Sequence, residues 1–420
     1  MRIVAAREAA DNAAGIAVLF AKIAGEQASS VRLTLLGRLA TYGAMVAHSE
    51  MLQRIARLTP LGDVLPLIDA LTRPVAPRQV AVESAFRLIL AQDALAETAR
   101  PVVALAIRDG WAVSSTDVID ASATAPVPLM PAPVWLETGD PLPPSADAVA
   151  PFDVVVWQGA IAEAVAPVAP GEGVLAAGGD VAAGTLLRSA GARLRHSDLA
   201  ALAAAGVAEV TVRVPRICVV CASLRNPIVD AAEAFIAATI AAEGGAVLRG
   251  TDAGADELER AFQADGADAV VVIGGTGTGK RDASVRALVR SGNVAAHGIA
   301  ISPGETASLG DVDGRPVLLL PGRIDSALAG WLLLGRPLLA QLAGSKESDG
   351  GRAGVLSRKV ASSLGLAEVI PVRRSGGDVE PLASGYLSLA AIANADGWIL
   401  VPPNSEGYPA GATVTVRPLP

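Results

Sequence analysis

The run AVVVIGGTGTGKRD, residues 269–282, leads from five apolar residues directly into a loop that holds four glycines. A short run of β-branched residues bounded by glycine predicts a buried strand, and the pattern from Ala283 onward predicts a helix. Glycines let the backbone approach a ligand closely, and the amides at the start of a helix attract anions. The stretch therefore predicts an anion-binding loop at the carboxyl end of a strand.

The sequence around this run alternates between strand and helix patterns. Strands and helices of this length in strict alternation predict a three-layer α/β domain, in which helices cover both faces of a parallel sheet. The predicted strands are ICVVC (217–221), AVLRG (246–250), AVVVIGG (269–275) and VLLLPG (317–322), and the predicted helices are 229–243, 256–264, one from 283, and 326–342.

The rest of the chain predicts several further domains, as its length of 420 residues requires. An Ala-rich start predicts a helical extension, and the helical patterns at 79–98 and 196–206 predict a helical linking domain. Proline-punctuated Val-rich runs predict a small β-rich domain, and the C-terminal part predicts a β-barrel-like domain. The predicted limits are 1–58 for the extension, 59–100 with 185–213 for the linking domain, 101–184 for the β-rich domain, 214–345 for the α/β domain and 346–420 for the C-terminal domain.

Composition narrows the classes of partner. A net charge of −8 argues against a surface that coats nucleic acid. Cys218 and Cys221 cannot supply the four ligands of a zinc site, so we expect apolar cysteines in a buried strand. The apolar runs are shorter than the roughly 20 residues that span a bilayer, and no signal peptide is evident. We expect a cytoplasmic protein that binds neither nucleic acid nor membrane.

The loop alone leaves several ligands open. GGTGTGK, from Gly274 to Lys280, matches the P-loop pattern GxxxxGK, but Arg281 stands where that motif places Ser or Thr for magnesium. A dinucleotide fingerprint fits poorly because its third glycine falls too early. A tight turn without a ligand is the remaining alternative. Asp282 either caps the helix or shares a cation with the ligand.

A family resemblance narrows these alternatives. AVVVIGGTGTGKRDASVRAL, residues 269–288, resembles the molybdopterin-binding loop of molybdopterin adenylyltransferases and molybdotransferases. The chain is similar, as a divergent member, to the molybdopterin molybdotransferase family (MoeA and gephyrin E-domain-like). The other similar segments follow in the family's order: AIRDGWAV (106–113), LETGDPLPPSADAV (136–149), 178–212, HGIAISPGE (297–305), VLLLPGRIDSA (317–327) and 384–411.

The resemblance implies an enzyme of molybdenum cofactor biosynthesis. Such an enzyme inserts molybdate into adenylylated molybdopterin and releases AMP with the help of Mg²⁺. It also implies an elongated homodimer, with a molybdoenzyme or another cofactor-synthesis protein as a candidate partner. A non-catalytic molybdopterin-binding carrier or chaperone is the alternative, and a P-loop nucleotide hydrolase is a third hypothesis.

The resemblance also assigns roles to residues. Asp109, Asp180 and Asp282 match catalytic carboxylates, with Asp109 and Asp282 as ligands of Mg²⁺, a cation that prefers oxygen. Asp109 and Asp180 have an alternative as turn residues. The predicted binding residues are Gly274, Gly275, Thr276, Gly277, Thr278, Gly279, Lys280, Pro303, Gly304, Pro321, Gly322 and Ser326.

Three segments depart from the family's pattern. The family's TGDEL turn becomes CASLRNP, so Leu224 and Arg225 replace an acidic pair. KPGKP becomes SPGET, in which Ser302 and Glu305 replace two lysines. PGNPVSA becomes PGRIDSA, residues 321–327, which loses the second proline at or near Ile324, and the positive charge of Arg323 and Arg225 is a candidate replacement. The lost groups favour the carrier hypothesis, whereas the retained aspartates favour the enzyme.

Overall fold

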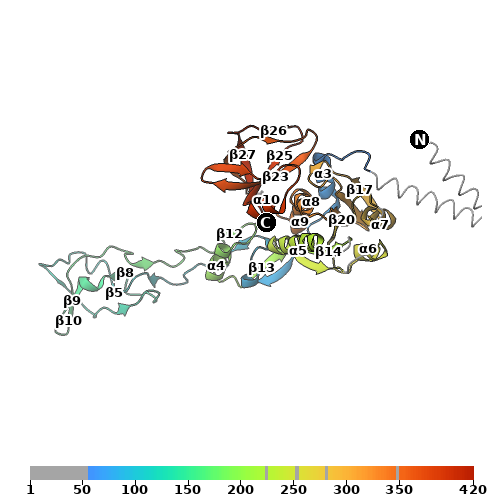
Figure 1. The fold of residues 1–420 in the computed structure, drawn as a ribbon. Helices are drawn as coiled ribbons and strands as arrows, with labels where there is room; N and C mark the ends of the chain where they lie inside the picture. Colours follow the sequence, from blue (N-terminus) through green and yellow to red (C-terminus); the bar gives the residue numbers. More distant parts are fainter. Residues whose placement is uncertain (1–54, 223–225, 251–254, 280–281, 347–349) are drawn as a thin grey trace, which may run out of the picture.

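The computed structural model describes residues 55–420 except 223–225, 251–254, 280–281 and 347–349. The predicted helical extension therefore lies almost wholly outside the described residues. The remainder is elongated: an α/β domain and a C-terminal barrel form one body, and a slender β-rich arm extends from it through a linking region (Figure 1). We propose the limits predicted from the sequence as the domain boundaries.

The α/β domain is built on a six-stranded sheet in the order β15-β14-β16-β20-β19-β17. The first four strands run parallel, as predicted, but β19 runs antiparallel to both of its neighbours, β20 and β17, so β17 points in the same direction as the first four strands. The sheet is mixed because the chain returns through a hairpin between β19 and β20 instead of a helical crossover. The strands are β14 (Arg216–Cys221), β15 (Ala246–Arg249), β16 (Ala269–Ile273), β17 (Asn293–His297), β19 (Ser308–Val312) and β20 (Arg315–Leu320).

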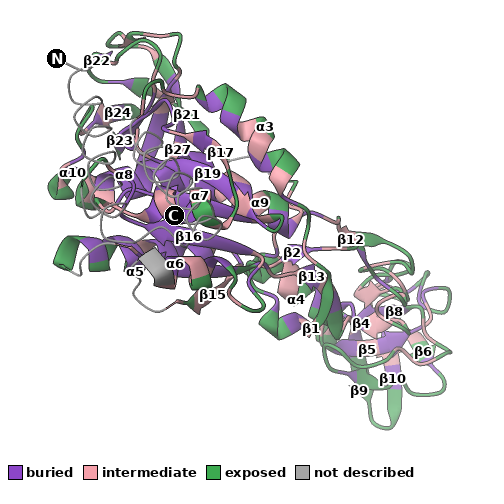
Figure 2. Cartoon of the chain, turned by 90° about the vertical axis from the view of Figure 1, so that its right-hand side faces the viewer, coloured by how far each residue is buried: buried purple, intermediate pink, exposed green. Residues whose placement is uncertain are grey.

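Helices cover both faces of this sheet, so the predicted three layers are confirmed. Alternate residues of each strand point to opposite faces. Val271 and Leu318 belong to the core on the side of α5, α8, α9 and α3, whereas Val272 and Leu319 pack with α6 and α7. Buried residues concentrate along the sheet (Figure 2). The helices are α3 (Leu61–Leu71), α5 (Pro227–Ala242), α6 (Ala255–Phe262), α7 (Ser284–Ser291), α8 (Ile324–Gly330) and α9 (Arg336–Ala343), with a π-helical turn at Trp331–Gly335.

Two expectations about apolar segments are tested in this domain. Cys218 and Cys221 are free and buried in β14, as predicted. The helical stretch Ile324–Ala343 is longer than the apolar runs expected from the sequence, because it continues past Arg336. Its 20 residues match a bilayer span by length and composition. Its apolar window is 78% buried inside the protein, where its leucines join the sheet's core.

The prediction of a helix over 79–98, and with it a purely helical linking domain, was wrong. The segment forms β1 (Arg78–Ala81), a 3-10 turn (Val82–Ser84), β2 (Ile89–Leu90) and β3 (Ala94–Leu95). Val80 pairs with Val210 of β13 (Glu209–Arg213), and Arg87 takes a positive φ of 66°, which ends any helix. The predicted helix at 196 does form, as α4 (His196–Ala204). The linking region is completed by β12 (Leu186–Arg188), which pairs with β3.

The arm is β-rich, as predicted, and has two small cores. One core gathers around Val113, Ala148 and Ala162, and the other around Ala106 and Val149. Its sheets are therefore thin, and both cores lie away from the main body. The strands are β4 (Leu105–Ala106), β5 (Gly110–Val113), β6 (Val127–Leu129), β7 (Trp135–Leu136), β8 (Ala148–Ala150), β9 (Val155–Gln158), β10 (Ile161–Ala164) and β11 (Val174–Leu175), with a 3-10 turn at Phe152–Val154.

The C-terminal domain is a closed five-stranded barrel, because β23 pairs with both β24 and β25. A sixth strand, β18 (Ile301–Ser302), comes from the α/β domain and pairs with β23 from outside. The barrel is thereby attached next to the loops that follow the α/β strands. The barrel strands are β21 (Arg352–Leu356), β23 (Ala367–Ser375), β24 (Asp378–Pro381), β25 (Gly397–Val401) and β27 (Thr413–Pro418); β22 (Val360–Ala361), β26 (Gly407–Tyr408) and α10 (Leu389–Asn394) lie outside the ring.

Candidate functional site

Three loops meet at the carboxyl ends of β16 and β20. The amide of Gly274 donates to the carbonyl of Leu320 at 2.8 Å, which joins the glycine loop to the end of β20. The hydroxyls of Thr276 and Thr306 lie 2.9 Å apart and join the glycine loop to the loop after β18. A Cβ on Gly304 would lie 3.2 Å from the carbonyl oxygen of Ser326. The structure therefore brings the predicted binding residues together, except Lys280, which lies outside the described residues.

The turn out of β16 depends on two glycines. Gly274 and Gly275 have φ angles of 91° and 69°, in the left-handed region that favours glycine. A Cβ on Gly275 would lie 2.4 Å from Oγ of Ser284. That hydroxyl donates to the carbonyl of Gly274 at 2.7 Å, and the amide of Ser284 donates to the carbonyl of Gly275 at 3.1 Å. Ser284, which the sequence did not single out, thus fixes the turn against the start of α7.

Asp282 closes the far end of the loop. Its Oδ2 accepts a hydrogen bond from the amide of Gly279 at 2.8 Å, and its own amide donates to the carbonyl of Gly279 at 3.0 Å. A Cβ on Gly277 or Gly279 would lie 2.7 or 2.8 Å from the same oxygen. The residue that precedes α7 as its N-cap is Ala283. Asp282 therefore braces the glycine loop instead of capping the helix, and the two glycines leave room for its carboxylate.

The loop after β20 contains a charged pair that the sequence did not predict. Arg323 donates from Nε and Nη2 to the two carboxylate oxygens of Asp325, at 3.1 Å each. These bonds, together with the negative charge of Asp325, raise the pKa of the Arg323 guanidinium. The positive charge expected to replace the family's lysines is therefore matched by a carboxylate inside the same loop. Across the site, Glu305 accepts from the amide of Gly304 at 3.2 Å.

Asp109 and Asp180 lie away from these loops. Asp109 precedes β5, is exposed, and accepts from the amide and the hydroxyl of Thr138 at 2.7 and 2.9 Å. Those two bonds hold the pKa of Asp109 below its usual value. Asp180 is also exposed, and its amide donates to the carbonyl of Arg100 at 3.0 Å. These contacts fit the turn-residue alternative for both.

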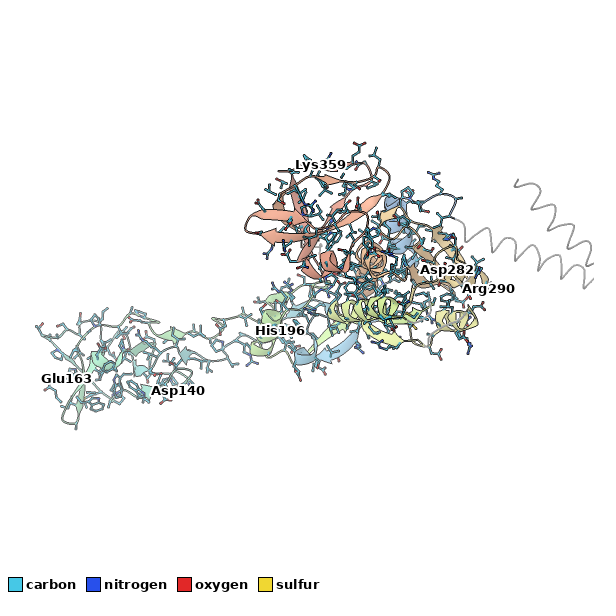
Figure 3. All side chains as sticks on the ribbon, viewed as in Figure 1. Asp140, Glu163, His196, Asp282, Arg290 and Lys359 are labelled. Atoms are coloured by element: carbon cyan, nitrogen blue, oxygen red, sulfur yellow. The ribbon has the colours of Figure 1, made fainter. Side chains whose placement is uncertain are left out.

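One chain does not bring Asp109 to Asp282. Asp140, two residues beyond the partner of Asp109, lies on the arm, and Asp282 lies at the opposite end of the molecule (Figure 3). Within the described part of the chain, no three His, Cys, Asp or Glu residues are grouped so that they could hold a metal ion. The predicted Mg²⁺ site with both aspartates is therefore not formed inside a single copy.

Sequence reasoning missed Ser284, Thr306 and Asp325. Ser284 is fully buried and Asp325 is 3% exposed. Polar residues at positions that the strand and helix patterns bury are a usable signal, because a buried polar group requires partners. Asp325 in the apolar context of IDSALAG carried that signal.

A glycine loop on a three-layer α/β domain, with a β-rich arm and a closed barrel, defines a multidomain α/β protein with a candidate anion-binding site at the edge of its sheet. Family profiles match nearly the whole described chain: the MoeA N-terminal region (domain I and II) over 48–206, a probable molybdopterin binding domain over 216–341, and the MoeA C-terminal region (domain IV) over 353–419. The chain belongs to the MoeA family, and its three-layer α/β domain, β-rich domain and C-terminal barrel are those predicted from the sequence.

Individual relatives agree with this assignment. The chain is 29% identical over 399 residues to molybdopterin molybdenumtransferase 2 of Mycobacterium tuberculosis, covering 83% of this chain and 97% of the relative. It is 26% identical to a putative molybdopterin biosynthesis protein of Methanocaldococcus jannaschii, covering 81% and 91%. A crystal structure of the molybdopterin biosynthesis MoeA protein of Pyrococcus horikoshii superimposes with a TM-score of 0.70 at 27% identity, covering 87% of this chain and all of that one.

The Asp109–Thr138 contact gives a prediction about pH. Thr138→Val removes the hydroxyl bond, so the pKa of Asp109 should rise toward its usual value when measured by carbon-13 NMR titration. Because the folded pKa is lowered, the contact contributes fully to stability above the unfolded pKa, and that contribution is lost as pH falls through the folded pKa. Asp147, whose pKa is lowered by Ser115, is the control and should titrate unchanged. An unchanged Asp109 titration would contradict the assignment.

Proposed function

We propose that the chain is a molybdopterin molybdotransferase of molybdenum cofactor biosynthesis, which inserts molybdate into adenylylated molybdopterin and releases AMP. The observation that carries the proposal is the joining of the three loops after β16, β18 and β20 around the glycine turn. Relatives that align over most of their length are named molybdopterin molybdenumtransferases. A ligand at this edge of the sheet would occupy the position that open α/β sheets use for binding.

Each loop would contribute a different kind of contact. The glycine turn presents backbone amides and the exposed Thr278, all donors suited to phosphate oxygens. Pro303 and Pro321 are buried, and Gly304 lets its loop pack closely against Ser326, whose carbonyl oxygen would lie 3.2 Å from a Cβ at that position, while the partly exposed Gly322 would offer backbone to the ligand. An anion near Ser326 would accept a hydrogen bond from its hydroxyl, which otherwise donates to Asp325 at 3.3 Å. Lys280 stays a proposed binding residue on resemblance alone.

Mg²⁺ is proposed as the cation, with Asp109 and Asp282 as its ligands and Asp180 as a further catalytic carboxylate. The donor chemistry fits, because carboxylate oxygens suit a hard cation and the low pKa of Asp109 keeps it ionised. Bound there, Mg²⁺ would neutralise charge on phosphate and molybdate oxygens. Asp282, held by Gly279, would present its carboxylate at the edge of the glycine loop.

A homodimer is proposed because one chain keeps the two aspartates apart. In a dimer with twofold symmetry, every contact between the two copies occurs twice. The arm of each copy would then supply Asp109 to the glycine loop of the other. The extended arm with exposed Asp109 near its β5 strand is suited to such a reach (Figure 1). We place this dimer in the cytoplasm, with a molybdoenzyme or another cofactor-synthesis protein as the recipient of the product.

AMP release tests the proposed reaction. Purified protein with adenylylated molybdopterin, Mg²⁺ and molybdate should release AMP, and Asp282→Asn should slow this about a hundredfold or more, because the proposed Mg²⁺ ligand loses its charge and the loop is held less precisely. Asp313→Asn, in the exposed β19–β20 turn of the same domain, is the matched control and should match wild type. Tight pterin binding without AMP above background would establish the carrier instead, and nucleotide turnover without pterin would establish the hydrolase.

Mixing two inactive variants tests the shared site. If Asp109 and Asp282 act from different copies, Asp109→Asn and Asp282→Asn chains mixed by reversible unfolding should regain about a quarter of wild-type activity, since half the dimers then hold one intact site. Each variant treated alone should stay inactive. No recovery in mixtures shown by mass spectrometry to contain heterodimers would rule out a site built between copies.

A further inference from the structure

The loop after β20 is held by a buried carboxylate with four donors around it. Asp325 is only 3% exposed. Its oxygens accept from Arg323 twice, at 3.1 Å, and from the amide and hydroxyl of Ser326, at 2.8 and 3.3 Å. A buried carboxylate is costly unless it is paired and hydrogen-bonded, and this one is both. The pair therefore fixes the loop from Arg323 to the first turn of α8.

Arg323 also contacts the barrel. Its Cζ lies 5.0 Å from the centre of the Tyr386 ring, within the range of a cation–π interaction. The loop that carries Tyr386 is itself anchored, because Glu368, 3% exposed on β23, accepts from Oγ of Ser384 at 2.7 Å and the amide of Gly385 at 2.6 Å. Glu368 lies opposite Ser302 in the β18–β23 pairing. The barrel thus supports two of the three site loops.

The backbone at this loop explains what the pair replaces. Arg323 is the N-cap of α8, with φ −81° and ψ 137°, and Ile324 is the first helical residue. Proline suits that first position, because its ring presets φ and the missing N–H has no partner within the helix. The extended N-cap is also the conformation that a residue before proline prefers. The similar family segment PGNPVSA has its second proline here, whereas this chain has Ile324 between Arg323 and Asp325.

We propose that Arg323 and Asp325 are positioning residues that replace the proline: they hold the loop of residues 321–326 in the shape that binds ligand, and Arg323 ties it to the barrel through Tyr386. The inference rests on the proposed function of the site. Proline would restrict the loop through its own ring, whereas the pair restricts it through contacts that span three residues and reach a second domain. The two charges cancel, so the loop is held without a net charge beside an anionic ligand.

The test first removes the Arg323–Asp325 pair and then introduces the family's proline at position 324. Arg323→Asn/Asp325→Val takes out both charges, so no unpaired carboxylate is left buried. Its KM for adenylylated molybdopterin should rise about tenfold with kcat within about twofold, because a loosened loop must be ordered on binding. Amide exchange in residues 321–328 should become faster. The triple variant that adds Ile324→Pro should return both KM and exchange to within about twofold of wild type.

Controls separate this effect from general loosening. Arg373→Asn/Glu380→Val removes an ion pair on the barrel that is 2.6 Å long and exposed, and should change neither readout. Tyr386→Leu should speed exchange in residues 321–328, and an unchanged rate would overturn the barrel contact. A double variant with wild-type KM and exchange, or a triple variant without recovery, would overturn the replacement of proline. Wild-type protein that releases no AMP would refute the proposed function. The amide exchange rates of residues 321–328 in the double and triple variants would still test whether the pair holds the loop.

Discussion

The two consecutive glycines after β16 hold left-handed backbone conformations, and the geometry of the site depends on them. Their φ angles of 91° and 69° turn the chain back so that the amide of Gly274 meets the carbonyl of Leu320 and the hydroxyl of Ser284 meets the carbonyl of Gly274. A side chain at Gly275 would occupy the space of that hydroxyl. This turn sets the position of the glycine loop against β20, the contact of that loop with Thr306, and the start of α7. The left-handed backbone at two glycines therefore determines where the three loops meet.

The strands and helices of the α/β domain were predictable because long apolar runs bounded by glycine have few alternatives. The helix over 79–98 was mispredicted because Val82, Ile89 and Leu90 recur at helical spacing, whereas Val80, Ile89 and Leu90 pair with the distant β13, which the local pattern does not reveal. The strands β17 and β19 were missed although β19 forms a hairpin with β20 around Asp313 and Gly314, a dipeptide that favours such a turn. Short strands depend on tertiary pairing that a local pattern does not contain.

The candidate site was predictable to a different degree in each part. The glycine loop was found from its own residue pattern and the two proline-containing loops by resemblance, and the structure joins them. The separation of Asp109 from Asp282 was not predictable, because order along the chain says nothing of distance across a long arm. Arg323 was expected to supply free positive charge, but Asp325, two residues away, neutralises it. The resemblance thus pointed to the candidate binding surface, while the charge balance of that surface required coordinates.

The central claim is that the loops after β16, β18 and β20 together form the molybdopterin site. Hydrogen–deuterium exchange of the full chain, with and without molybdopterin, tests it most directly. The account predicts slower exchange in residues 274–279, 303–306 and 321–326, and no change in the barrel strands β21 and β27. Bound pterin that leaves these three loops unprotected, or protects only the linking region, would contradict it.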